Sequence, residues 1–184
     1  MNPYFCTKDL AVGYNGNTLI RDICIQLEKG AVLTLIGPNG AGKSTILKTL
    51  SRHLASLHGT VHIDAQDISA LSPRQLARQM AVVLTDRIRP ELTTCAEVVA
   101  MGRYPYTNLF GRLTPQDTAA VEDALRQVHA LDLAQQDFAT LSDGQRQRIM
   151  LARAICQMPE VIVLDEPTSF LDIRYKLEFL SIIQ

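Results

Sequence analysis

Residues 31–45 read AVLTLIGPNGAGKST and divide into an apolar run, a glycine-rich turn and a Lys-Ser-Thr triplet. The run at 31–36 is almost continuously apolar, as in a strand that is buried on both faces of a parallel sheet. Apolar side chains then recur at helical spacing over residues 43–57. Strand, turn and helix thus follow one another directly, which predicts an α/β fold with a mostly parallel sheet flanked by helices.

The glycine-rich turn matches the phosphate-loop (P-loop) pattern G-x-x-x-x-G-K-[ST]. Its glycines can adopt positive φ and carry no Cβ, so successive backbone N–H groups can point at phosphate oxygens. We expect Lys43 to reach the β- and γ-phosphates of ATP and the Ser44 hydroxyl to bind Mg²⁺. A turn that merely links strand to helix is the alternative, and the flanking strand and helix favour the phosphate site. The predicted ATP-binding residues of the turn are Gly37, Pro38, Asn39, Gly40, Ala41, Gly42, Lys43, Ser44 and Thr45.

Two further apolar runs, at residues 81–84 and 161–164, read as buried strands, and the second ends in two carboxylates, Asp165 and Glu166. In open α/β sheets, ligands bind at the carboxyl ends of the strands. We therefore predict that Asp165 holds Mg²⁺ and that Glu166 is the catalytic general base, which polarises the attacking water. A solvated acidic turn would give the same pattern, and the P-loop upstream favours the catalytic interpretation.

Residues 141–145 read LSDGQ and open a predicted helix over 146–156. Ser142 and Gln145 fit a capping box, in which each side chain binds the backbone N–H of the other residue. Capping does not explain Gly144, whereas an approaching phosphate does, because glycine removes side-chain bulk at the helix N-terminus.

Together these motifs resemble those of ATP-binding cassette (ABC) ATPases, whose signature reads LSGGQ, and the resemblance covers nearly the whole chain. It implies a P-loop NTPase core with an N-terminal antiparallel β portion and an inserted helical subdomain. Tyr14 stands where the family stacks an aromatic ring on adenine, and Asp172 is the acidic residue of a D-loop-like SFLD segment. The family also implies a head-to-tail homodimer that sandwiches two ATP molecules. The signature residues facing the ATP of the other copy are then Ser142, Asp143, Gly144 and Gln145.

The chain departs from the family pattern in three places. Asp143 replaces a glycine of the signature, and its carboxylate suits a helix N-terminus but lies near the incoming phosphate. Thr85 occupies the position of the Q-loop glutamine. The family's switch histidine falls beyond Gln184, so we interpret the chain as a nucleotide-binding domain truncated at its C-terminus. The histidines present are interpreted as surface or turn residues: His53, His58, His62 and His129.

We predict a single ABC nucleotide-binding domain over residues 1–184, incomplete at its C-terminus. The first third reads as short strands broken by turns. Residues from about 87 to 140 read as helical, with Pro115 opening a long helix, and we expect them to form the inserted helical subdomain.

The charge balance argues against a nucleic-acid-binding protein. The net charge is −1, with 18 Lys and Arg against 19 Asp and Glu, whereas nucleic-acid binders usually show a basic face. The four cysteines are scattered, which favours reduced thiols in a cytosolic protein over disulfides or a zinc site. We expect no export signal and no membrane span, because no window approaches roughly 18 apolar residues.

Residues 98–106 read VVAMGRYPY and closely resemble the ABC importers of iron–siderophore complexes, haem and cobalamin, and residues 171–175 point the same way. In those importers this region docks the permease. The resemblance therefore implies a peripheral subunit on the cytoplasmic face of the membrane, with permease subunits and a substrate-binding protein as partners. A soluble ABC ATPase of cluster-assembly type and an inactive truncated fragment remain alternatives.

Overall fold

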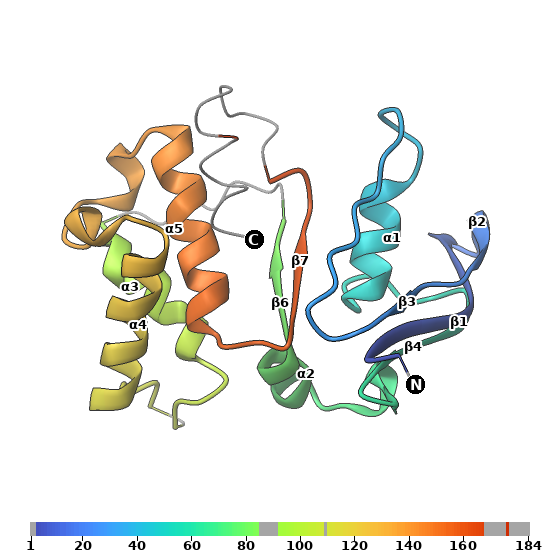
Figure 1. Ribbon diagram of the computed structural model, residues 1–184, viewed down its shortest axis with the longest axis horizontal. Coiled ribbons are helices and arrows are strands. Elements are labelled where there is room, and N and C mark those ends of the chain that lie inside the picture. The colour runs from blue at the N-terminus through green and yellow to red at the C-terminus, as the bar shows by residue number, and fades with distance from the viewer. Residues whose placement is uncertain (1–2, 85–91, 109, 168–175, 177–184) are drawn as a thin grey trace. The chain divides into compact units, whose positions relative to one another are not determined.

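The computed structural model describes residues 3–84, 92–108, 110–167 and 176. Its chain divides into an N-terminal unit, Met1–Leu76, and a C-terminal unit, Ala77–Gln184 (Figure 1). Each unit is built around its own sheet. The five strands that pair in the first sheet are all antiparallel, and the two strands of the second are parallel.

The N-terminal sheet is built around β1 (Phe5–Tyr14). This strand pairs on one side with β2 (Asn17–Ile23) and on the other with β4 (His58–Ile63), while β3 (Gln26–Leu27) also pairs with β1 and β5 (Gln66–Asp67) pairs with β4. All of these pairings are antiparallel. The expectation of an N-terminal antiparallel β portion is therefore confirmed.

Turn residues fix the register of this sheet. Asn15 and Gly16 connect β1 to β2 and have φ values of 50° and 79°, as a tight hairpin turn of the primed types requires. Gly59 in β4 approaches β1 so closely that a Cβ there would lie 2.3 Å from the carbonyl oxygen of Lys8. The side chains of Leu10 and Val12 in β1 are completely buried, so this strand supplies much of the unit's core.

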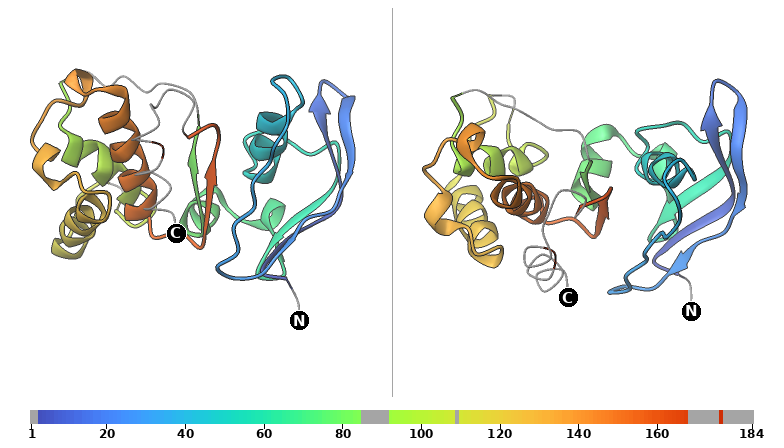
Figure 2. Two further views of the ribbon diagram at one scale, coloured as in Figure 1. Left: turned by 45° about the horizontal axis from the view of Figure 1, so that its top comes forward. Right: turned by 90° about the horizontal axis from the view of Figure 1, so that it is seen from above.

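Helix α1 (Lys43–Leu50) lies beside the N-terminal sheet and contacts β1 (Figure 2). It ends earlier than the helical spacing over 43–57 predicts. Arg52 adopts a positive φ of 59°, and the N–H of His53 donates to the carbonyl oxygen of Lys48. This pattern is a Schellman closure, which terminates an α-helix whatever the apolar spacing beyond it.

The predicted strand at residues 31–36 is not formed. The segment has no strand assignment, and the side chains of Val32 and Ile36 are 75% and 91% exposed. A buried parallel strand is stable only when neighbours accept its backbone hydrogen bonds. None of the strands in the described part of the chain pairs with this segment, and the parallel sheet contains only β6 and β7. The sequence-based prediction was wrong here because an apolar run does not supply its own partner.

The parallel sheet of the C-terminal unit joins β6 (Met80–Val83) to β7 (Val161–Leu164), with Met80 opposite Val161 and Val83 opposite Leu164. Helix α2 (Pro73–Gln79) leads directly into β6. The apolar runs at 81–84 and 161–164 thus form strands, within one residue of their expected limits. Crossing from one parallel strand to the other takes the chain through a helical region.

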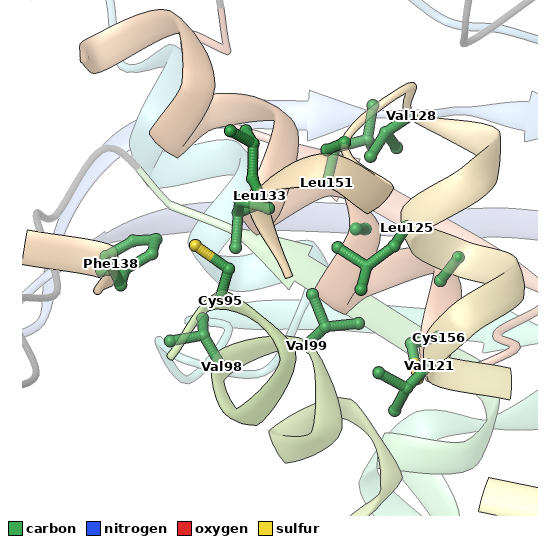
Figure 3. Packing of buried hydrophobic residues seen from close by; sticks show 14 of the residues in the cluster. Cys95, Val98, Val99, Val121, Leu125, Val128, Leu133, Phe138, Leu151 and Cys156 are labelled. Carbon is green, nitrogen blue, oxygen red and sulfur yellow. The ribbon is translucent and has the colours of Figure 1, made fainter. Parts of the chain in front are cut away.

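That region contains α3 (Cys95–Ala100), α4 (Pro115–Gln127) and α5 (Asp143–Cys156), which pack together. Short 3-10 helices complete it: η2 (Met101–Arg103), η3 (Leu131–Leu133) and η4 (Phe138–Thr140). Their apolar faces meet in one core, whose side chains point toward one another in Figure 3. The largest fully buried members of this core are Cys95, Val98, Val99, Leu125, Val128, Phe138, Ile149 and Cys156.

Candidate nucleotide site

The P-loop precedes α1 and contains two glycines in the left-handed region. Gly40 and Gly42 have φ values of 81° and 88°, and α1 begins immediately afterwards at Lys43. A Cβ at Gly42 would also lie 2.9 Å from side-chain carbons of Leu19 and Ile20. The positive φ favours glycine at residue 42, and a Cβ there would also make the ends of the Leu19 and Ile20 side chains shift.

The Lys43 ammonium group folds back over the loop. Its Nζ donates to the carbonyl oxygens of Gly37 at 2.9 Å and of Pro38 at 2.8 Å. The Lys43 side chain thus closes over the loop through these two hydrogen bonds. Residues 37–41 are exposed to solvent.

Tyr14 lies beside the first turn of α1. Its hydroxyl is 3.3 Å from Oγ1 of Thr45, which is buried, while the tyrosine side chain is itself 49% exposed. Ser44, the second residue of α1, is half-buried. The N-terminal unit thus brings together the P-loop and Tyr14, the two elements of the predicted site that lie within it.

The acid pair follows β7 in the C-terminal unit. The N–H of Asp165 donates to the carbonyl oxygen of Val83 at 2.9 Å, which continues the pairing of β7 with β6. Asp165 is buried, whereas Glu166 is exposed and has a positive φ of 49°.

The signature begins α5 through the predicted capping box, which is confirmed. The N–H of Gln145 donates to Ser142 Oγ at 3.3 Å, and the N–H of Ser142 donates to Gln145 Oε1 at 3.0 Å. The Ser142 hydroxyl also donates to Gln145 Oε1, at 3.0 Å. A phosphate that bound Ser142 would therefore have to replace Gln145 Oε1 as the acceptor of this hydroxyl hydrogen bond.

An ion pair that the motif analysis missed lies on the same turn. Nη1 of Arg146 donates to Oδ1 of Asp143 at 3.1 Å. The signal was present in the sequence, because opposite charges three residues apart lie on one face of a helix. Arg146 was overlooked because the signature pattern ends at Gln145.

A second missed residue, Arg103, anchors the other end of α5. Its Nε donates to Oδ1 of Asp117 at 2.8 Å, its Nη1 donates to the carbonyl oxygen of Cys156 at 2.9 Å, and its guanidinium lies 4.0 Å from the ring centre of Tyr106. The Tyr106 hydroxyl donates to the carbonyl oxygen of Gln157. Segment 98–106 is thus fastened to the C-terminal end of α5. Sequence spacing gave no signal, because Arg103 and Asp117 meet only through the fold.

Hydrogen bonds set the ionisation of Asp117. The backbone N–H and the hydroxyl of Thr114 both donate to its Oδ2, and Arg103 adds a third bond and a positive charge. These contacts, the Thr114 backbone bond first, hold the pKa of Asp117 below its ordinary value although burial opposes them. The carboxylate is therefore ionised inside the unit.

The remaining predicted site residues are not brought together by described contacts. Thr85 and Asp172 lie outside the described residues. The P-loop belongs to the N-terminal unit, and the acid pair and the signature belong to the C-terminal unit, so their assembly into one site stays a prediction. Of the histidines, His53, His58 and His129 are exposed, and His62 is half-buried within β4.

A glycine-rich phosphate loop before a helix, an acid pair after a parallel strand and a capped LSDGQ turn define the class of ABC ATPase domains. A family model described as ABC transporter matches residues 20–169, and the chain belongs to this family. Within the described part of the chain, no helix is both long and apolar enough to cross a membrane.

The chain is similar in sequence to curated proteins that are longer than itself. An ABC transporter ATP-binding protein of Methanocaldococcus jannaschii is 46% identical over 97% of this chain and 61% of its own length. The iron(3+)-hydroxamate import ATP-binding protein of Bacillus subtilis is 39% identical over 96% of this chain, and the achromobactin transport ATP-binding protein of Dickeya dadantii is 42% identical over 97%. This chain spans 66% of each of the latter two.

Solved structures confirm the fold. A structure described as an inward-facing metal-chelate type ABC transporter aligns with a TM-score of 0.85 at 30% identity, over 100% of this chain and 67% of that one. An ATP-binding cassette in its ADP conformation aligns with a TM-score of 0.86 at 20% identity, over 100% of this chain and 76% of that one. The chain thus has the fold of an ABC ATPase domain.

Proposed function

We propose that this chain is the ATP-binding and ATP-hydrolysing part of an ABC importer that takes up a metal chelate. One observation carries the proposal: Gly40 and Gly42 hold positive φ in a loop that runs straight into α1 at Lys43. Backbone N–H groups in such a loop, together with the helix N-terminus, form a binding site for phosphates.

Each site residue has a chemical role in this proposal. Lys43 exchanges its two loop carbonyls for β- and γ-phosphate oxygens, and Tyr14 stacks on the adenine. Ser44 and Asp165 supply the hard oxygen ligands that Mg²⁺ prefers, and Mg²⁺ neutralises charge on the phosphates when it is bound. Glu166 accepts a proton from the attacking water, a role typically worth about 10²–10⁴-fold in rate.

A second copy completes the site in this proposal. The first turn of its α5, with Ser142 and Gly144, faces the γ-phosphate held by the P-loop of the first copy, while Thr85 and Asp172 serve in the Q-loop and the D-loop. A single copy then binds ATP and turns it over slowly. The homodimer works at the cytoplasmic face of the membrane, with permease subunits and a substrate-binding protein.

The import of a metal chelate is supported by the relatives and by segment 98–106. The names of two relatives give iron(3+)-hydroxamate import and achromobactin transport, and that of a third, from Halobacterium salinarum, gives cobalamin import. Segment 98–106 is fixed to α5 by Arg103 and Tyr106, and Tyr104 within it is 60% exposed. An exposed aromatic on a fastened segment suits a surface that contacts a permease.

One observation favours a second candidate, a chain that binds nucleotide weakly or not at all by itself. Residues 31–36 precede the P-loop directly, form no strand and expose Val32 and Ile36. A phosphate loop works best when a rigid strand fixes its first residue. The two candidates differ in whether the isolated chain binds MgATP.

Thermal unfolding with and without MgATP separates them, with Lys43→Ala as the control. A ligand that binds only the folded state adds about 2.7 kcal/mol at 100 times its Kd. We expect MgATP to raise the melting temperature of the wild-type chain and to leave that of Lys43→Ala unchanged. Glu166→Gln should retain the shift and lose hydrolysis. A wild-type melting temperature indifferent to MgATP contradicts the proposal for this chain.

A further inference from the structure

The first turn of α5 carries a negative charge where the proposed function needs to receive an anion. Asp143 is the first residue of the helix, directly after the N-cap Ser142, and its side chain is 46% exposed. A carboxylate is favourable at a helix N-terminus because it complements the helix dipole. The same charge repels a terminal phosphate that arrives at that turn. The negative charge of Asp143 therefore has to be offset by a positive charge if the turn is to bind ATP.

Arg146 lies in position to do so. Its Nη1 is 3.1 Å from Oδ1 of Asp143, and the arginine side chain is only 20% exposed. Its other terminal nitrogen donates to the carbonyl oxygens of Ala139 at 3.3 Å and Leu141 at 3.1 Å. The guanidinium also lies 5.6 Å from the ring centre of Phe138.

These contacts hold the guanidinium against the loop that leads into α5. Arginine suits this arrangement because its planar fork can bind carbonyls and a carboxylate at the same time. The positive charge is therefore fixed beside Asp143 before any ligand arrives, and it does not have to be recruited from a mobile side chain.

We propose that Arg146 is a positioning residue that offsets the charge of Asp143, so that the first turn of α5 can accept the terminal phosphate of ATP held on a second copy of this chain. The inference rests on the proposed function, because it assumes that two copies pair around ATP. It adds that the aspartate in this signature depends on an arginine three residues later.

A simpler role for Arg146 is to anchor the loop at residues 139–141, with Asp143 as a bystander. The two roles give different results in a double-mutant cycle. If Arg146 only anchors the loop, its replacement costs the same whether residue 143 is charged or neutral. If it offsets charge, the cost falls when Asp143 is replaced by Asn.

The experiment measures MgATP-driven pairing by sedimentation equilibrium, in chains that all carry Glu166→Gln to slow hydrolysis. We expect Arg146→Gln to weaken pairing about tenfold when Asp143 is present and less than about twofold in the Asp143→Asn background. Arg146→Lys keeps the charge but lacks the planar fork, so it should recover part of the loss. Raising the salt concentration should shrink the Arg146→Gln defect, because it screens a charge effect.

Three outcomes are distinguishable. A large loss when Asp143 is present and a small one in the Asp143→Asn background supports the inference. Equal losses in the two backgrounds overturn it and leave the proposed function standing. If the Glu166→Gln reference chain folds but does not pair in MgATP, the proposed function fails and the inference fails with it. Melting temperatures measured on the same samples confirm that each variant is folded.

Discussion

At the C-terminal end of α5 the guanidinium of Arg103 is buried against Asp117, whereas at the N-terminal end Arg146 meets Asp143 near solvent. The side chains of the first pair are 9% and 5% exposed, and those of the second are 20% and 46% exposed. Removing one partner of a buried pair leaves the other charge buried with neither a partner nor water to stabilise it. A pair that is partly exposed to solvent costs less free energy to break. The C-terminal end of α5 is thus held by a buried pair, whereas the end proposed to face the nucleotide is held by a pair whose carboxylate is half-exposed.

The largest effect on the free energy of unfolding is expected at the C-terminal end of α5, where Arg103 is buried. Arg103→Leu removes the partner of a buried carboxylate and the bond to the carbonyl oxygen of Cys156. Removing one partner of a buried pair typically costs about 3–5 kcal/mol. Urea unfolding of the variant should show a loss of that size in the free energy of unfolding.

Arg126 provides the matched control on an exposed surface. It pairs with Glu122 at 2.6 Å and with Asp123 at 2.5 Å on α4, and its side chain is 56% exposed. Arg126→Gln should cost less than about 1 kcal/mol, as exposed pairs usually do. Equal losses for Arg103→Leu and Arg126→Gln would contradict the contrast between buried and exposed pairs.

The buried pair also predicts how stability changes with pH. The pKa of Asp117 is lowered, first by the Thr114 backbone bond and then by the Thr114 hydroxyl and Arg103. Its contribution is therefore complete above the unfolded-state pKa of about 3.9 and is lost as the pH falls through the lower folded-state value. The stability advantage of wild type over Asp117→Asn should be constant near neutral pH and shrink below about pH 4. An advantage that persists unchanged in acid would show that the carboxylate is not held ionised.

Local signals in the sequence predict much of the C-terminal unit correctly. Helix α4 begins at Pro115 as expected, because proline at the first helical position and a Thr114–Asp117 capping box define that start locally. The LSDGQ turn likewise predicts the capping box at Ser142. Helix boundaries that are set by caps can be predicted from the sequence, because donor and acceptor lie within four residues of each other.

Features that depend on contacts between residues far apart in the sequence cannot be predicted in the same way. The apolar run at 31–36 predicts a buried strand, but only a neighbouring strand could fix it, and none of the described strands pairs with it. Arg103 and Asp117 are fourteen residues apart and meet because η2 and α4 both pack against α5. A site formed by segments far apart in the sequence, such as the predicted pairing of the P-loop with Asp165, depends on the fold in the same way.

A small effect on stability separates two uses of one motif. Ser142 and Thr94 form capping boxes of the same kind, at the starts of α5 and α3. Replacing either by Ala removes the N-cap side chain that accepts from the N3 backbone N–H and should cost about 1 kcal/mol. MgATP-driven pairing should weaken only for Ser142→Ala, since its hydroxyl alone is proposed to meet the phosphate. If Thr94→Ala weakens pairing as much, the loss follows from helix stability, and the hydroxyl of Ser142 has no separate role in binding ATP.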